Sequence, residues 1–476
     1  MNLVLQTARS PGQTAREHLM EQLRAALLSG QVTAGDALPS TRILAATMGV
    51  SRGTVVAVYE DLAGEGYVLS VPGSGTFVAD DLPVTAAQPI PVQPGRTSQE
   101  HEASPPARTG EVINLSPGSP STSFHTNRDW VAAWRRAVKR DLPSVPPPAA
   151  GEEELRRLIA EHLRAARGVQ CGADDIVVTA GTNDGLGLLL HGLAAEGPAG
   201  ARIATENPGY PAARQVITHL GAIPVPIPVR DGGMDPDALV REQGPFAAVL
   251  LTPSHQYPLG GRLPVAARLA MLAWAKDTGA IIIEDDYDSE FRHGAPSLPA
   301  IASLGDGHQV VLVGSYSKTL TPWLRCGYLV VADPELRTRI LAVREVLGQP
   351  VSGLIQAALA EFLRTGGLRR HLVRVGREYA HRRSLVIAAT AHLASHARLD
   401  AIEGGLHATV SWDDGTPAEH VATLLAHRGI QVASLGTYYH PGTRPRRNGL
   451  VFGYGAATDL QLRRALQEIV TVINTS

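Results

Sequence analysis

A proline-rich segment divides this sequence into two parts that fold separately. Residues 80–110 read DDLPVTAAQPIPVQPGRTSQEHEASPPARTG, with neither the apolar period of a helix nor that of a strand. Such a segment buries too little apolar surface to offset the cost of ordering its backbone, so we expect an extended, partly polyproline-like linker. The sequence therefore predicts a small domain over residues 1–79 and a large domain over residues 111–476.

Composition and hydropathy bound the class of protein. Of the 476 residues, 44% are hydrophobic and 18% are charged, as in globular proteins with large cores. No basic N-terminal segment precedes a long apolar run, and no apolar stretch approaches the roughly 20 residues of a membrane helix, so we expect a cytoplasmic protein with no membrane partner. The two cysteines, Cys171 and Cys326, lie far apart and indicate neither a disulfide framework nor a zinc site.

The small domain has the spacing of a winged helix-turn-helix. The stretch AREHLMEQLRAALLSG places leucines at helical intervals and ends at Gly30. Two further helices are predicted, with Ser40 and Ser51 as their N-caps and Gly49 in the tight turn between them. The β-prone runs GYVLSV and GTFVA flank the turn residues PGSG and predict a hairpin.

The stretch LPSTRILAATMGVSRGTV resembles the GntR family of DNA-binding domains, and the match covers most of residues 12–79. The resemblance implies double-stranded operator DNA as a partner. The start of the second helix of such a motif enters the major groove, where arginine can bind guanine with two hydrogen bonds. The alternative is that Arg42 and Arg52 are only solvated residues on helix faces. The residues implied to face DNA are Arg42, Ser51, Arg52, Thr54 and, at the wing tip, Gly73, Ser74 and Gly75.

The charge of the small domain does not by itself indicate DNA binding. Residues 1–80 contain five arginines against seven acidic residues, so the strongly basic composition expected of a tight DNA-binding domain is missing. Either the arginines gather on one face, or two copies of the domain engage two half-sites. In both cases we expect affinity to depend only modestly on salt.

The large domain alternates apolar β-prone runs with helical stretches, from DIVVTAG to QVVLVGSYSK. This alternation predicts an α/β fold with a mostly parallel sheet covered by helices on both faces. After about residue 330 the pattern becomes mainly helical, and a small C-terminal α+β subdomain is expected from about residue 370.

Lys318 is a candidate for covalent chemistry. Of the 43 lysine and arginine residues, only Lys139, Lys276 and Lys318 are lysines, and a guanidinium forms no Schiff base with an aldehyde. In QVVLVGSYSKTL, Lys318 follows a buried strand and a polar turn, at the sheet edge where open α/β sheets bind ligands. The alternative is a lysine that merely faces solvent in a loop.

Neighbouring strand ends offer partners for this amine. In AIIIEDDYDSEF a strand ends in clustered carboxylates, which need a metal or another cation such as a protonated pyridine nitrogen. No histidine accompanies them at ligand spacing, which disfavours a metal. In TAGTNDG, Gly181, Thr182 and Asn183 begin a helix, where backbone N–H groups bind phosphate or simply form a cap. The side chains that can complete an anion site are Ser315, Ser317 and Arg325.

The large domain is similar to the fold-type I pyridoxal-phosphate enzymes of the aminotransferase class, and SYSKTLTPWLRCGY resembles their Schiff-base lysine motif. The resemblance implies pyridoxal 5'-phosphate as cofactor, with Lys318 as the Schiff-base lysine. It also implies that Asp285 pairs with the pyridine nitrogen and that Tyr287 donates to the ring's 3-oxygen. In ENPGYP it points to Tyr210 as the aromatic over the cofactor, and in TPSHQYPLGG it places His255, Gln256 and Tyr257 in the segment where many aminotransferases have Asn-Pro-x-Gly. The residues implied to hold the phosphate are Gly181, Thr182, Ser315 and Arg325.

The order of the parts, a GntR-type domain, a proline-rich linker and an aminotransferase-like domain, resembles the MocR/GabR family of bacterial transcriptional regulators. The resemblance implies a homodimer that senses an amine, an amino acid or pyridoxal phosphate itself through Lys318. One alternative is an active aminotransferase with an appended DNA-binding module, and another is a DNA-binding scaffold whose second domain only dimerises. Against turnover, NGLVFGYG has Leu450 and Val451 where many aminotransferases carry a substrate-binding arginine. The nearby candidates to replace it are Arg444, Arg446 and Arg447.

Overall fold

The computed structural model describes residues 3, 5–7, 12–71, 74–79, 112–121, 124, 126–141, 143–193, 197–292, 299–305, 307–400, 402–413, 416–443 and 447–475. The chain divides into two compact units, Met1–Arg108 and Thr109–Ser476. The linker predicted over residues 80–110 lies outside the described residues. Every helix among the described residues is too short or too polar to cross a membrane.

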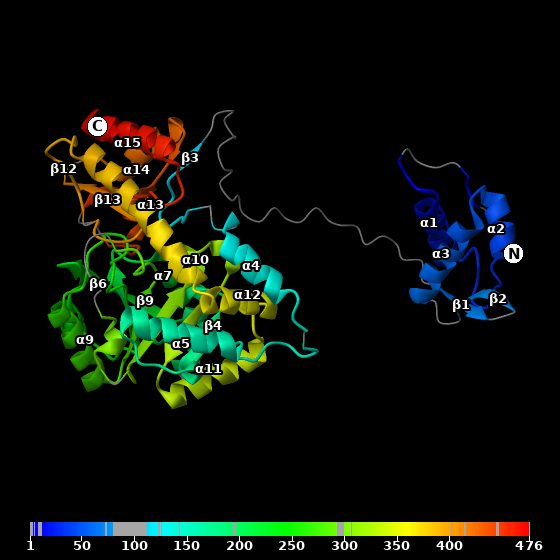
Figure 1. The fold of residues 1–476 in the computed structure, drawn as a ribbon, viewed down its shortest axis with the longest axis horizontal. Coiled ribbons are helices and arrows are strands. Elements are labelled where there is room, and N and C mark those ends of the chain that lie inside the picture. Colours follow the sequence, from blue (N-terminus) through cyan, green and yellow to red (C-terminus); the bar gives the residue numbers. More distant parts are fainter. Residues whose placement is uncertain are drawn as a thin grey trace. The chain divides into compact units, whose positions relative to one another are not determined.

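The N-terminal unit is a winged helix-turn-helix, which confirms the prediction. Its core is formed by buried side chains of all three helices and both strands, including Leu23, Leu44, Val55 and Val78. The strands pair antiparallel, from Val68 opposite Val78 to Val71 opposite Gly75. The elements are α1 (Ala15–Leu28), α2 (Thr41–Met48), α3 (Arg52–Gly64), β1 (Val68–Val71) and β2 (Gly75–Val78) (Figure 1).

The predicted caps delimit these helices. The hydroxyl of Ser40 accepts a hydrogen bond from the backbone N–H of Ile43, and that of Ser51 accepts one from Thr54. Each satisfies a backbone donor that the first turn of a helix leaves unpaired. Gly49 ends α2 with a φ of 64°, a left-handed conformation that glycine adopts at little cost.

The C-terminal unit is built on an eight-stranded sheet. Six strands run parallel, and only β11 and β7 run against their neighbours, so the prediction of a mostly parallel sheet is confirmed. The strand order is β4 (Ile176–Thr179), β11 (Gly327–Val331), β10 (Val310–Ser315), β9 (Ile281–Asp286), β8 (Ala248–Leu251), β5 (Arg202–Asn207), β6 (Ile223–Arg230) and β7 (Gly233–Met234).

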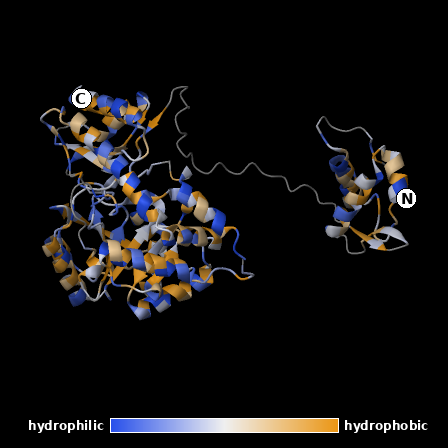
Figure 2. Ribbon diagram, in the orientation of Figure 1, coloured by the Kyte–Doolittle hydropathy of each residue, from blue (hydrophilic) through white to orange (hydrophobic). Residues whose placement is uncertain are grey.

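Helices cover both faces of this sheet because alternate strand residues point to opposite sides. In β10, Leu312 packs in one core cluster while Val311 and Val313 pack in another. Blue and orange alternate along these helices, as expected of helices with one buried face (Figure 2). The helices on the first face are α4 (Arg128–Ala137), α5 (Glu153–Arg167), α8 (Pro236–Arg241), α9 (Val265–Thr278) and α12 (Gly353–Arg364), and those on the second are α6 (Thr182–Leu193), α7 (Pro211–His219) and α11 (Pro334–Leu347).

A smaller subdomain packs its own core around Trp412, Tyr379 and Tyr454. Its four-stranded antiparallel sheet has the order β12 (Ala397–Leu399), β13 (His407–Trp412), β16 (Asn448–Gly453) and β15 (Ala433–Ser434). Its helices are α13 (Gly367–Thr390), α14 (Ala418–His427) and α15 (Asp459–Thr475). The beginning of the unit joins it, because β3 (Ile113–Asn114) pairs with β14 (Ile430–Gln431).

Candidate functional site

Lys318 lies just beyond the carboxyl end of β10, in the one-turn helix α10 (Tyr316–Thr319), where the sequence had indicated only a polar turn. Its side chain is partly buried. Burial lowers the pKa of the amine, against the opposing effect of the Asp288 and Asp285 carboxylates. A lowered pKa increases the fraction of neutral amine, the form that attacks a carbonyl carbon.

A pocket in front of Lys318 collects side chains from several strand ends. Because β4, β5, β8, β9 and β10 run parallel, their carboxyl ends meet at one edge of the sheet. The structure thus brings together six residues that the sequence analysis named, and adds two others. The lining residues are Gly118, Thr182, Tyr210, Thr252, Tyr257, Asp285, Tyr287 and Lys318.

Three of the four carboxylates at the end of β9 have partners within the protein. Glu284 accepts from the backbone of Ile301 and Ala302, Asp286 pairs with Arg167 at 2.9 Å, and Asp288 lies 2.8 Å from His255. Three of the four charges are thus accounted for without a ligand.

Asp285 is the exception. It is 5% exposed, and its Oδ1 has no hydrogen-bond partner among the described residues. Burial, assisted by the charges of Asp286 and Asp288, raises the pKa of its carboxyl to about 8, and Lys318 only partly opposes the shift. A buried, unpaired carboxyl facing a pocket is a binding site for a cationic or hydrogen-bond-donating group.

The predicted phosphate cup is partly assembled. Gly181 has a φ of 97°, and the hydroxyls of Ser315 and Ser317 lie 4.0 Å from the point where its Cβ would be. The two hydroxyls contact each other at 3.0 Å, and α6 begins next to them at Thr182. Asn183 is exposed on the first turn of α6 and does not line the pocket.

Arg325 follows a short 3₁₀ helix with a φ of 45°, and its residue is exposed. Its charge acts on the site. Burial and the charge of Asp285 raise the pKa of Tyr210 to about 12, and the positive charge of Arg325 partly opposes this rise. Arg325 therefore lies near Tyr210, although it is not among the residues that line the pocket.

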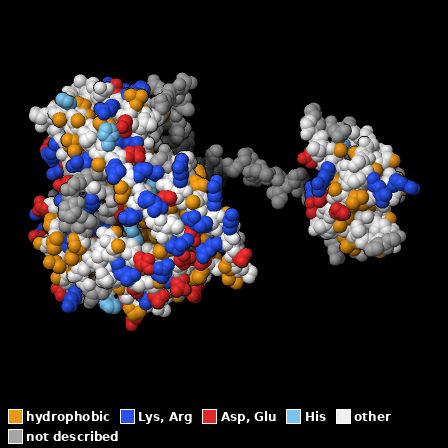
Figure 3. Space-filling view, in the orientation of Figure 1, with side chains coloured by type: hydrophobic (Ala, Val, Ile, Leu, Met, Phe, Trp, Pro, Cys, Tyr) orange, Lys and Arg blue, Asp and Glu red, His pale blue; other side chains and the backbone are white. Residues whose placement is uncertain are grey.

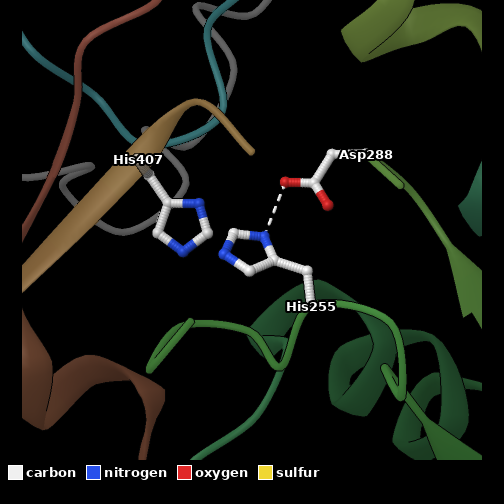
Figure 4. A group of neighbouring side chains, drawn as sticks. All are labelled: His255, Asp288 and His407. Atoms are coloured by element: carbon white, nitrogen blue, oxygen red, sulfur yellow. Dashed lines mark hydrogen bonds and ion pairs between the residues drawn. The ribbon is translucent and has the colours of Figure 1, made fainter. Parts of the chain in front are cut away.

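His255 lies behind the pocket lining and contacts Tyr287. Its Nδ1 is 2.8 Å from Asp288 Oδ2 and 2.9 Å from the Tyr287 hydroxyl. Figure 4 shows the imidazole of His407 beside that of His255, with a ring-centroid separation of 4.8 Å. Since His407 belongs to β13, this contact joins the small subdomain to the edge of the large sheet.

Potential metal ligands are also present here. One ligand atom each from His255, Asp288 and His407 lies within 4.8 Å of the others, an arrangement that spacing along the sequence did not reveal. One nitrogen of each ring already makes a hydrogen bond, and His407 Nε2 is bonded to the Pro258 carbonyl at 3.1 Å, whereas His255 Nε2 and His407 Nδ1 have no partner among the described residues. A Cβ at Gly405 would overlap both Asp288 and His255, so the backbone fills the neighbouring space. A metal ligated by Asp288 Oδ2 would have to displace the contact of that oxygen with His255 Nδ1.

Sequence reasoning missed four residues at this site. Thr252 directly follows β8 and Glu206 is the next-to-last residue of β5, and these positions at strand ends were an available signal. Glu206 accepts a hydrogen bond from the Thr252 backbone at 3.1 Å, and burial raises its pKa to about 7. Gly118 and His407 come from distant segments, and no local pattern marks them. A Cβ at Gly118 would lie 2.7 Å from Lys318 Nζ.

The arginines of the small domain differ in whether they have acidic partners. Arg16 pairs with Asp61 at 2.7 Å and Arg24 pairs with Glu65, so these four charges neutralise one another around α1 and α3. Figure 3 shows blue side chains standing out from the other end of this unit, around α2.

Arg42 and Arg52 are exposed and have no acidic partner among the described residues. Arg52 donates to the Thr41 hydroxyl at 3.3 Å, which links the starts of α2 and α3. Ser51 and Thr54 contact each other as part of the α3 cap. On the wing, Ser74 and Gly75 are exposed, whereas Gly73 lies outside the described residues.

Comparisons with known proteins match both units. The family "Bacterial regulatory proteins, gntR family" matches residues 15–78, and "Aminotransferase class I and II" matches residues 110–451. The chain is 41% identical over 456 residues to the HTH-type pyridoxine biosynthesis transcriptional regulator PdxR of Corynebacterium glutamicum, covering 96% of this chain and 95% of the relative. It is 33% identical to the probable rhizopine catabolism regulatory protein MocR of Rhizobium meliloti, covering 95% and 92%. The chain belongs to the MocR-type transcriptional regulators.

As a MocR-type regulator, the protein is a DNA-binding transcription factor that carries an aminotransferase-like domain. Solved structures agree on the fold of that domain. An archaeal alanine:glyoxylate aminotransferase superposes with a TM-score of 0.71 at 21% identity, over 77% of this chain and 92% of the other. The class I aminotransferase fold depends in general on pyridoxal phosphate.

Proposed function

We propose that this regulator binds pyridoxal phosphate in the Lys318 pocket, and that occupancy of the pocket controls its affinity for operator DNA in the cytoplasm. The effector is the cofactor itself, or an amine or amino acid that reacts with it. The name of the PdxR relative, a regulator of pyridoxine biosynthesis, supports the cofactor as the signal. A ligand changes the DNA-binding equilibrium only if it binds one conformation more tightly than the other.

The observation that carries this proposal is the unpaired, buried Oδ1 of Asp285 in the same pocket as Lys318. Pyridoxal phosphate supplies an aldehyde that condenses with amines and a ring nitrogen that becomes cationic beside a carboxylate. Asp285 would pair with that nitrogen, and Tyr287 would donate to the 3-oxygen. Tyr210 would lie against the ring. The phosphate would be held by Gly181, Thr182, Ser315, Ser317 and Arg325.

The small subdomain favours sensing over amino-acid turnover. Leu450 and Val451 are fully buried in β16, so this strand offers no cation to a substrate carboxylate. Arg447 lies 3.6 Å from Asp400, and the other two arginines of its loop lie outside the described residues.

A homodimer completes the proposal. Trp323, a few residues beyond Lys318, is 91% exposed, and a side chain of this size stabilises an interface when a second copy buries it. Two copies would also present two winged helices to two DNA half-sites, which raises the effective affinity of each.

The test is the absorption spectrum of the protein with pyridoxal phosphate, recorded beside Lys318→Ala. We expect a visible band in the parent that the variant lacks. Operator DNA, selected from a random library with the full-length protein, is then titrated with pyridoxal phosphate and with pyridoxamine phosphate, which lacks the aldehyde. A parent without the band would overturn cofactor binding, and equal DNA affinity with and without both ligands would overturn the cofactor as the signal.

A further inference from the structure

Two groups compete for one nitrogen of His255. Its Nδ1 lies 2.8 Å from Asp288 Oδ2 and 2.9 Å from the Tyr287 hydroxyl oxygen. An imidazole nitrogen either carries a hydrogen and donates it, or is bare and accepts one. His255 Nδ1 therefore either donates to Asp288 or accepts from Tyr287, and the choice sets the direction of the Tyr287 O–H.

Burial decides between these two patterns. Asp288 is 2% exposed and His255 is 3% exposed. A buried carboxylate without a donor is costlier than a hydroxyl that turns its hydrogen elsewhere, so Nδ1 carries the hydrogen and donates to Asp288. Burial also raises the pKa of Tyr287 well above its usual range, so its hydroxyl keeps its hydrogen.

The neighbouring imidazole of His407 does not supply a proton to His255. Burial lowers the pKa of His407 to about 3, and its Nε2 is bonded to the Pro258 carbonyl. His407 is therefore neutral, and its Nε2 is the nitrogen that carries the hydrogen. Other groups around this cluster also act on it through their charges or dipoles, namely Glu206, Tyr257, Asp285, Arg292, Lys318 and Tyr454.

We propose that Asp288 is a positioning residue that acts through His255. By keeping a hydrogen on Nδ1, Asp288 prevents His255 from accepting a hydrogen bond from the Tyr287 hydroxyl. The hydrogen of that hydroxyl then points into the pocket beside Lys318, where it is donated to the 3-oxygen of bound pyridoxal phosphate. This inference rests on the proposed function, but its first half, the location of the hydrogen on His255, holds without the cofactor.

The first test uses the cofactor-free protein labelled with ¹⁵N-histidine, in which nitrogen chemical shifts report which ring nitrogen carries hydrogen. His255 is assigned from the signal that His255→Gln removes. We expect Nδ1–H in the parent and in Asp288→Glu. In Asp288→Asn, whose amide can donate to Nδ1, we expect the hydrogen to move to Nε2. A parent with a bare Nδ1 would overturn the proposal.

The second test titrates the visible band of the loaded protein with pH. Without a hydrogen bond from the Tyr287 hydroxyl, the 3-oxygen is more electron-rich. It then holds the proton beside it more tightly, so the pH at the midpoint of the change in the visible band rises. We expect a rise of about one pH unit in Asp288→Asn and in Tyr287→Phe, and recovery in Asp288→Glu.

The double variant shows whether the two residues act through one path. Asp288→Asn combined with Tyr287→Phe should titrate like Tyr287→Phe alone, because the effect of Asp288 passes through that hydroxyl. Additive shifts, or an unshifted midpoint in Asp288→Asn, would overturn the inference. A parent without any band would instead count against the proposed cofactor, and the nitrogen shifts would still decide the location of the hydrogen.

Discussion

The guanidinium of Arg214 donates to the backbone carbonyl of Tyr438 at 2.7 Å. Arg214 belongs to α7 on the large sheet and is 8% exposed, whereas Tyr438 belongs to the small subdomain. Further hydrogen bonds run from Arg214 to the carbonyls of Gly209, Thr437 and Tyr439. One buried side chain thus ties the small subdomain to the strand end that leads into the Lys318 pocket.

Replacing Arg214 with alanine should destabilise the C-terminal unit. The change leaves several carbonyls without donors, and we expect the free energy of unfolding to fall by about 3 kcal/mol. Affinity for pyridoxal phosphate should also fall, because the Tyr438 hydroxyl lies 3.3 Å from that of Tyr257 in the pocket wall. Urea denaturation measures the first effect and a binding titration the second. Gln215→Ala, an exposed neighbour on the same helix, is the control and should change neither.

Local signals explain what the sequence predicted. Ser40, Gly49 and Ser51 delimit the helix-turn-helix through their own backbone and side-chain chemistry, which neighbouring residues in sequence suffice to reveal. The alternation of strands and helices predicted a parallel sheet, and parallel strands place their carboxyl ends at one edge. That rule alone was enough to predict that Asp285 and Lys318 lie close together, and both line one pocket.

What the sequence could not predict depends on packing between distant segments. Gly118 reaches Lys318 because the beginning of the unit pairs with the small subdomain, and His407 reaches His255 because β13 packs against the loop after β8. Asn183 shows a finer limit. The helix start was predicted correctly, but a helix start does not reveal which of its side chains face the pocket and which face solvent.

Asp285 should make the cofactor-free protein less stable as pH rises. Its pKa in the folded state, about 8, exceeds its ordinary value of 3.8, so between these values the folded state binds a proton that the unfolded state has lost. Stability therefore falls from about pH 4 to about pH 8. Asp285→Asn removes this loss, and we expect the variant to exceed the parent by on the order of 2 kcal/mol at pH 8.

Urea denaturation at pH 5, 6.5 and 8 measures this difference, which should grow with pH. Saturating pyridoxal phosphate should reverse the order at pH 8, because the parent gains a cationic partner for the carboxylate and the variant does not. A constant difference across the three pH values would show that Asp285 titrates normally.

Arg42 and Arg52 should contribute to DNA binding, and Arg16 should not. The first two are exposed without an acidic partner among the described residues, whereas Arg16 pairs with Asp61. Replacing either Arg42 or Arg52 with alanine should weaken operator binding at least tenfold and, for each phosphate that the variant no longer binds, reduce the slope of log affinity against log salt by about 1. Arg16→Ala is the matched control. Fluorescence anisotropy at several salt concentrations gives both quantities, and equal losses in all three variants would contradict this assignment.

Gly118 should be required for the position of the Lys318 amine. Its φ of 76° strains any other residue, and an added Cβ would lie 2.7 Å from Nζ and 3.1 Å from Cε of Lys318. Gly348 separates these two effects, because its φ of 75° is nearly the same but nothing lies within 4 Å of the point where its Cβ would be.

Gly118→Ala and Gly348→Ala should therefore both lose on the order of 1–3 kcal/mol of stability from backbone strain. Only Gly118→Ala should also lose the visible band of bound pyridoxal phosphate, because its methyl group would lie too close to the amine for both to keep their places. Thermal unfolding and absorption spectra of the two variants decide the matter. If Gly118→Ala keeps a full band, the lysine side chain has turned to another rotamer without losing its reach, and the close approach of Gly118 does not determine where the amine lies.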